Sequence, residues 1–163
     1  MFKGPADQVY ILRRLHSFII AKHNREHDFQ NEFIDAVHGM LLYLDNTMVI
    51  AFEQPTDLGE VLCSGLLCML GRSTIINALF TVTEHAQHPP ASFVALIRNT
   101  TQEVSLHLAA AMASRQYNLV GHLLLSLPND MAHIVFGSPL LNAIKLRDIT
   151  LLRLVIEHLG RLR

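Results

Sequence analysis

The sequence predicts an all-α fold of stacked helical hairpins, and three observations support that prediction. Every segment with a clear hydrophobic period shows the three-and-four spacing of an amphipathic helix. No segment shows the convincing alternation of a strand, although AHIVFG (132–137) could form a short extended piece. Prolines and glycines divide the helical segments into short pairs. The 163 residues, half of them hydrophobic, are expected to form a single domain with its own core.

Two long helices are expected at the start of the chain. In 7–23 the apolar residues recur at three and four, and Asn24 is a plausible end. The second helix is expected from Asp28, a good N-cap residue, to the pair Asp45-Asn46. Together these segments predict a helical hairpin.

Shorter helices are expected in the rest of the chain. Pro55 breaks the chain, and Asp57 with Glu60 resembles a capping box that opens a third helix running towards Gly71. Ser73 is expected to cap the fourth. The remaining helical segments are predicted at 73–86, 90–98, 104–115, 117–126, 139–146 and 148–160.

A paired-helix unit recurs three times in the second half of the chain. Its first helix opens with a motif of small and aliphatic residues that ends in Ala: STIINA (73–78), VSLHLA (104–109) and SPLLNA (138–143). Its second helix carries a pattern of spaced aliphatic residues: FVALI (93–97), VGHLL (120–124) and LLRLV (151–155). Each such hairpin exposes an apolar face that only a stacked neighbour buries.

These motifs resemble the ankyrin repeat family, whose first helix opens with Thr-Pro-Leu-His-x-Ala and whose second helix carries Val-x-x-Leu-Leu. The closest stretches are SLHLA (105–109) and SPLLNAIKLRDITLLRLVIEHLG (138–160), and LPNDMAHIVFG (127–137) stands where the family has a projecting finger. The resemblance covers 73–163. It implies an ankyrin-like α-solenoid, with residues 1–72, which match no unit, as an N-terminal helical cap.

The sequence also departs from the family pattern. Arg147 stands where the family's turn between helices usually has Gly, and the middle unit has about three extra residues in AMASRQYN (111–118). An ordinary helical bundle that packs hairpins is therefore an open alternative to the repeat array.

The resemblance implies a non-catalytic module that binds a protein partner through the concave face of the repeats. The residues expected on that face or on the finger are Met112, Asn129, Asp130, Met131, His133, Asn142 and Lys145. Atypical units joined to unrelated helices also resemble host-directed bacterial effectors and viral proteins. A regulatory or inhibitory role in the cytoplasm, or in the host cytoplasm for a secreted effector, is the corresponding expectation.

Composition argues against other classes of partner. The formal net charge is −1, and no basic run exceeds Arg13-Arg14, whereas nucleic acid and anionic membranes need a concentrated basic face. The longest nearly apolar run (61–70) is far shorter than the roughly 18 residues of a membrane span, and the N-terminus lacks a secretion-signal pattern. Cys63 and Cys68 are expected to be buried, reduced thiols, as in a reducing compartment.

The stretch HNREH (23–27) matches one zinc-hydrolase pattern, His-x-x-Glu-His. Such a site needs both histidines on one continuous helix, whereas Asn24 and Asp28 predict a polar joint between two helices. Glu103, a candidate third ligand, falls in a predicted turn. We therefore expect no enzymatic activity, no cofactor and no metal. A zinc-dependent hydrolase and a self-associating helical structural protein remain the alternatives, the latter as a homo-oligomer.

Overall fold

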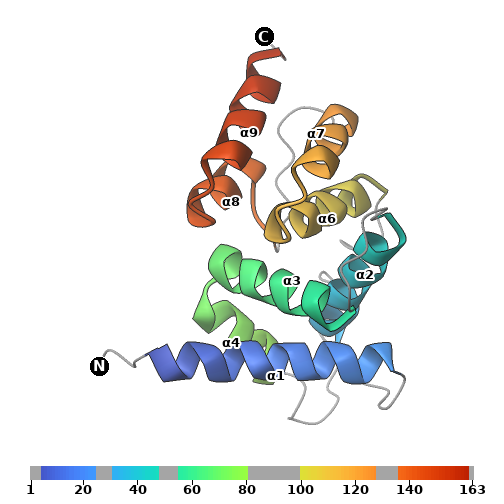
Figure 1. The fold of residues 1–163 in the computed structure, drawn as a ribbon, viewed down its shortest axis with the longest axis vertical. Coiled ribbons are helices and arrows are strands. Elements are labelled where there is room, and N and C mark those ends of the chain that lie inside the picture. The colour runs from blue at the N-terminus through green and yellow to red at the C-terminus, as the bar shows by residue number, and fades with distance from the viewer. Residues whose placement is uncertain (1–4, 25–30, 48–54, 81–99, 128–135, 162–163) are drawn as a thin grey trace. The chain divides into compact units, whose positions relative to one another are not determined.

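The computed structural model describes residues 5–24, 31–47, 55–80, 100–127 and 136–161. Across these ranges it contains eight α-helices and no strand (Figure 1). The predicted all-α class is confirmed. By internal contacts the chain divides into two compact units, 1–87 and 88–163.

The first unit contains four helices: α1 (Pro5–His23), α2 (Glu32–Thr47), α3 (Pro55–Leu70) and α4 (Arg72–Phe80). The first helix, α1, packs against the other three, and α3 contacts both α2 and α4. Ile11, Leu15 and Ile19, spaced by four, are buried at 5% exposure or less, which places the apolar stripe of α1 in the core. Although the sequence places α4 in the first repeat, α4 packs here against α1 and α3.

The second helix begins at Glu32, three residues later than a helix capped by Asp28 would, because Asn31 caps it. Asn31 Oδ1 accepts a hydrogen bond from the backbone N–H of Ile34 at 2.9 Å, the usual N-cap geometry. The amide nitrogen of the same side chain donates to the carbonyl of Ala78 at 3.1 Å, which ties the start of α2 to α4. Asp28, the predicted cap, lies outside the described residues.

The boundaries of α3 and α4 follow from one proline and one glycine. Pro55 is the first residue of α3, because a helix tolerates proline in its first turn, where the missing N–H is not needed. Gly71, with φ +80°, ends α3 as predicted. The fourth helix begins directly at Arg72, so Ser73 lies inside the helix and is not its cap.

The second unit contains two helical hairpins: α6 (Thr100–Ala113) with α7 (Tyr117–Ser126), and α8 (Pro139–Lys145) with α9 (Ile149–Arg161). The two first helices, α6 and α8, pack against each other, and so do the two second helices, α7 and α9. These four helices agree with the predicted segments within a few residues. The segment predicted at 90–98 lies outside the described residues.

The turns of the two hairpins have the same hydrogen bonds. In the first, Arg115 N–H donates to Met112 and Gln116 N–H donates to Ala111. In the second, Arg147 N–H donates to Ile144 and Asp148 N–H donates to Ala143. This pair of bonds defines a Schellman motif at a helix C-terminus.

Both turns place an arginine in the left-handed region, with φ 57° at Arg115 and φ 53° at Arg147. Glycine is favoured at this position, so arginine is strained there. The two arginines are 32 residues apart, which fixes the structural offset between the two hairpins.

The carboxylate of Asp148 joins the two turns. Its Oδ1 accepts hydrogen bonds from the N–H groups of Thr150 (3.0 Å) and Leu151 (3.1 Å), which caps α9. Its Oδ2 accepts a hydrogen bond from the Tyr117 hydroxyl at 2.9 Å and lies 3.6 Å from Arg115 Nε. This bond to the carboxylate, together with partial burial, raises the pKa of Tyr117. The side chain of Asp148, which is only 9% exposed, therefore links both hairpins.

We predict that Asp148→Ala lowers the free energy of unfolding by about 1–3 kcal/mol, because α9 loses its cap and the turns lose their link. Urea denaturation followed by circular dichroism measures this change. The control is Glu157→Ala, an exposed carboxylate on the same helix, which should change stability by less than about 0.5 kcal/mol. Equal effects of the two substitutions would contradict the role of Asp148.

Candidate partner-binding surface

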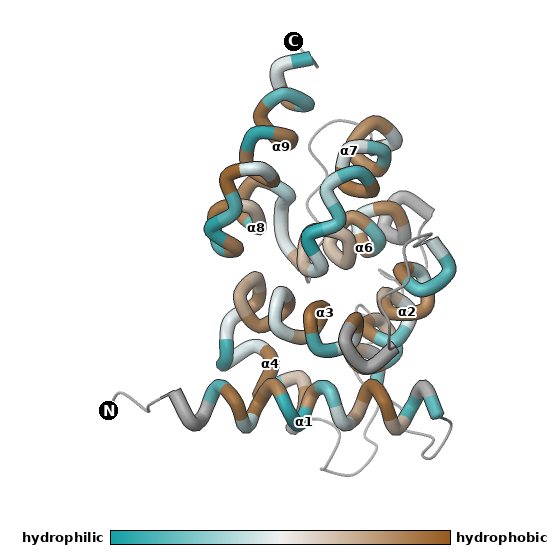
Figure 2. The backbone as a smooth tube through the Cα atoms, viewed as in Figure 1, coloured by the Kyte–Doolittle hydropathy of each residue, from teal (hydrophilic) through white to brown (hydrophobic). Residues whose placement is uncertain are grey.

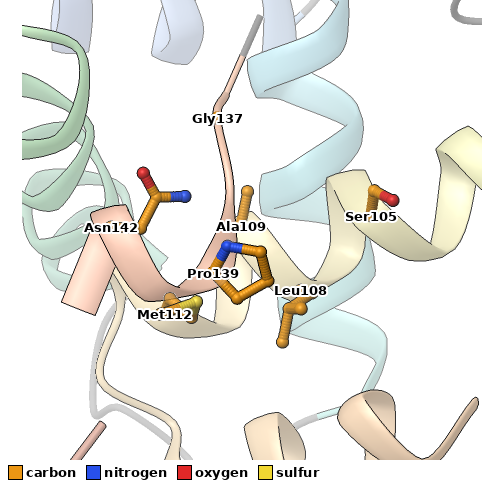
Figure 3. Close-up of a pocket in the computed structure, with 7 residues that line it drawn as sticks. All are labelled: Ser105, Leu108, Ala109, Met112, Gly137, Pro139 and Asn142. Atoms are coloured by element: carbon orange, nitrogen blue, oxygen red, sulfur yellow. The ribbon is translucent and has the colours of Figure 1, made fainter. Parts of the chain in front are cut away.

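A small cavity marks the contact between α6 and the start of α8 (Figure 3). Its volume is about 10 Å³, room for one water molecule and far below the roughly 300–1,000 Å³ of a small-molecule site. The side of α6 that faces it is a stripe at three-and-four spacing. The lining residues are Ser105, Leu108, Ala109, Met112, Gly137, Pro139 and Asn142.

Asn142 has a structural role at this contact. It is 2% exposed, and its amide nitrogen donates to the carbonyl of Phe136 at 2.7 Å, which holds the chain entering α8. Its Oδ1 has no hydrogen-bond partner in the structure, and a Cβ added at Gly137 would lie 3.3 Å from it. Because a buried carbonyl oxygen favours a partner, a water molecule in the adjoining cavity would satisfy it.

Two residues predicted on the concave binding surface are buried instead. Met112 is 0% exposed and Asn142 is 2% exposed, so neither presents a side chain to a partner in this structure. Asn142 is buried because its side chain holds the chain entering α8. Met112 is buried because α6 is not amphipathic in its second half, where every residue from Leu108 to Ala113 is buried. A helix that is apolar all round belongs in a core.

The other predicted contact residues have different outcomes. Lys145, the last residue of α8, is exposed as expected. The predicted finger residues lie outside the described part of the chain: Asn129, Asp130, Met131 and His133.

The 32-residue offset between the turns shows which part of α8 corresponds to the stripe on α6. Leu108, Ala109 and Met112 are at most 3% exposed. The residues 32 positions later have the same place relative to their own turn, yet they are exposed: Leu140 at 37%, Leu141 at 45% and Ile144 at 55%. The stripe that helix α8 covers on α6 is therefore uncovered on α8.

One pair on the second helices shows the same relation. Leu124 of α7 is 3% exposed, whereas its counterpart Ile156 of α9 is 53% exposed. Ile149, seven residues before Ile156 and thus on the same side of α9, is 71% exposed. Figure 2 shows the hydrophobic residues recurring along α8 and α9. We define the open face by its five exposed apolar side chains: Leu140, Leu141, Ile144, Ile149 and Ile156.

Cations predominate among the exposed charges on this hairpin. Exposed basic side chains stand at four positions of 136–161: Lys145, Arg147, Arg153 and Arg161. Glu157 is the one exposed carboxylate in that range, because Asp148 is largely buried between the two turns. Arg153, four residues after Ile149 and three before Ile156, lies within the apolar stripe of α9. The hairpin that carries the open face therefore has an excess of exposed cations, with Arg153 beside the apolar stripe of α9 and Glu157 four residues after it.

The open face could not be predicted from the repeated motif, because the motif offset between the two hairpins differs from the offset between their turns. VSLHLA and SPLLNA are 34 residues apart, and that alignment places Ala109 opposite Ala143. The turn bonds instead place Ala111 opposite Ala143, two residues further along. The arginine and the polar residue after it, Arg115-Gln116 and Arg147-Asp148, were the available signal for the correct offset.

The described residues give no support to the zinc pattern at 23–27. The first helix ends at His23, and Asn24 follows in a turn, while Glu26 and His27 lie outside the described residues. Glu103, predicted in a turn, lies within α6. Within the described ranges, no group of three or more His, Cys, Asp or Glu side chains could hold a metal ion.

One structural observation concerns membranes. Among the described residues, no single helix is long and apolar enough to cross a bilayer. The consecutive pair Leu58–Leu70 and Arg72–Leu79 meets the length and composition together, but the chain bends by 113° between them.

Comparisons with known proteins add no family assignment. The chain matched no protein-family model, no curated protein and no solved structure. The surface is therefore interpreted from its own geometry.

The two cysteines differ in exposure, so the expectation that both are buried is half correct. Cys63 is fully buried, and Cys68 is exposed. Burial, and secondarily the charge of Glu60, raises the pKa of the Cys63 thiol to about 12. Because the thiolate is the reactive form, Cys63 is shielded both by its surroundings and by its protonation.

We predict that an aromatic disulfide reagent at pH 8 modifies one thiol per folded chain rapidly and the second only after unfolding in urea. Absorbance of the released thiolate counts the modified thiols. Cys68→Ser should remove the rapid reaction, and Cys63→Ser should leave it intact. Two thiols reacting at the same rate in the folded protein would contradict the burial of Cys63.

Proposed function

We propose that this protein is a non-catalytic interaction module that binds a protein partner, and that the open face of α8 and α9 is its principal contact surface. The observation that supports this proposal is the unequal exposure of equivalent positions. Met112 is completely covered, whereas Ile144, at the same place in the next hairpin, is more than half exposed. Exposed apolar patches are typical of protein-interaction sites, and all five side chains lie on the hairpin of α8 and α9.

The energetics of such a surface suit a protein partner. Covering the exposed part of each leucine or isoleucine would contribute roughly 1 kcal/mol, so the five side chains together supply several kcal/mol. A few anchors normally dominate an interface, and Leu141 and Ile144, three residues apart on α8 and each about half exposed, are the expected anchors. Lys145, adjacent to Ile144, is the predicted contact residue that adjoins this surface.

We further propose that the two hairpins of the second unit form an ankyrin-like array. Its support is the like-on-like packing of α6 with α8 and of α7 with α9, together with the left-handed turn residue at Arg147, where that family usually has Gly. A regulatory, inhibitory or host-directed role stays a prediction from sequence. In this proposal the partner contacts the exposed side of α8 and α9 rather than a concave surface.

The test compares two matched variants of the full chain. Leu141→Glu combined with Ile144→Glu places two charges on the open face, and Leu125→Glu places one on a leucine of α7 that is 66% exposed and lies outside the open face. We expect the double variant to lose at least about tenfold in capture of the wild-type partner from a lysate of the source cells, since each anchor contributes at least 1 kcal/mol. Leu125→Glu should capture it normally, and quantitative mass spectrometry measures both.

Three results would contradict the proposal. The first is equal capture by the double variant and the wild type, with the helical circular dichroism signal unchanged in both. The second is one tightly bound zinc per purified chain that is lost on His27→Ala, which would favour the hydrolase. The third is a concentration-dependent mass without any second protein, which would favour the self-associating alternative.

A further inference from the structure

We infer that the segment covering the open face is an amphipathic helix whose apolar stripe is bordered by carboxylates. This inference rests on the proposed function and specifies its partner. Within the second unit, an apolar stripe of the same spacing is covered by a helix, because α8 packs over Leu108 and Met112 of α6, the positions that correspond to Leu140 and Ile144. Side chains repeating at three and four form ridges that accept the ridges of another helix.

The open face has the dimensions of a short helix. On α9, Ile149 and Ile156 are separated by two turns, about 10 Å along the axis. On α8, Leu141 and Ile144 are neighbours on one side of the helix. A helix with apolar residues at i, i+3, i+4 and i+7 presents a stripe of matching length, the usual pattern for recognition of a helix by an apolar surface.

The charges around the face specify the border of the partner. Arg153 lies within the stripe of α9, and Lys145 and Arg147 follow Ile144 at the turn. Asp148 offsets part of this charge at the turn, where its carboxylate also lies 3.6 Å from Arg115 Nε, and Glu157, four residues after Arg153, is the one exposed carboxylate of 136–161. Exposed cations outnumber exposed carboxylates four to one in 136–161, so a partner with carboxylates at its border is attracted and one with lysines is repelled.

A protein helix fits the face better than a polyanion does. Phosphate groups would contact the arginines but leave the exposed isoleucines in water, because a nucleic-acid backbone has no apolar stripe. A helix with acidic borders satisfies both features of the face together. The apolar contacts supply the affinity, and the borders select the partner.

The experiment uses two synthetic helical peptides as probes. Both carry the same leucine stripe at i, i+3, i+4 and i+7, bordered by glutamates in one peptide and by lysines in the other. Fluorescence anisotropy with the full chain should show the glutamate peptide binding about tenfold more tightly at low salt, with a smaller preference at high salt. Arg153→Glu should abolish or reverse that preference, and Arg13→Glu, an exposed arginine of the first unit, should preserve it.

The outcomes separate this inference from the proposed function. Equal binding of the two peptides, with binding lost on Leu141→Glu combined with Ile144→Glu, overturns the acidic border but supports the open face. Tight binding of the glutamate peptide that survives this double variant overturns both. An open face occupied by a second copy, seen as an Ile144-dependent dimer by sedimentation, overturns the inference. So does Ile144-dependent binding to phosphatidylserine vesicles in the absence of peptide binding.

Discussion

The structure of the second unit depends on the Asp148 carboxylate and the two left-handed turns that it connects. The Asp148 carboxylate caps α9 by accepting hydrogen bonds from the N–H groups of Thr150 and Leu151. It also accepts a hydrogen bond from the Tyr117 hydroxyl of the preceding hairpin. The two hairpins are thereby held in the same orientation, with first helix on first helix and second on second. Their order of stacking decides which apolar residues are covered, so the exposure of Ile144 follows from the same constraint that buries Met112.

Much of the local structure could be predicted because single residues determine it. Ser138 accepts a hydrogen bond from the N–H of Leu141 at 3.3 Å and Pro139 opens α8, so that boundary was readable from the sequence. Gly71 marked the end of α3 for the same kind of reason. The start of α2 was misplaced because Asp28 and Asn31 are both good cap residues, and the hydrogen bond from Asn31 to Ala78 is a tertiary contact that no local pattern contains.

The candidate surface was less predictable, because periodicity identifies an apolar stripe but not the neighbour that covers it. Met112 and Ile144 are similar residues at equivalent turn positions, yet one is buried and the other is exposed. Which neighbour covers a stripe is a property of the assembled unit. The four alanines at 109, 110, 111 and 113 also conceal the burial of α6, since alanine fits equally well on a surface and at a tight helix contact.

The central claim is that the outer side of α8 and α9 is the surface that a protein partner covers. Hydrogen–deuterium exchange with mass spectrometry, comparing the free chain with the chain purified in complex with its partner, tests this claim most directly. We expect slower exchange in peptides spanning Pro139–Lys145 and Ile149–Arg161, with α1 exchanging as in the free chain. Protection confined to α1, α2 or α3, with α8 and α9 unchanged, would place the partner on the first unit and contradict the claim.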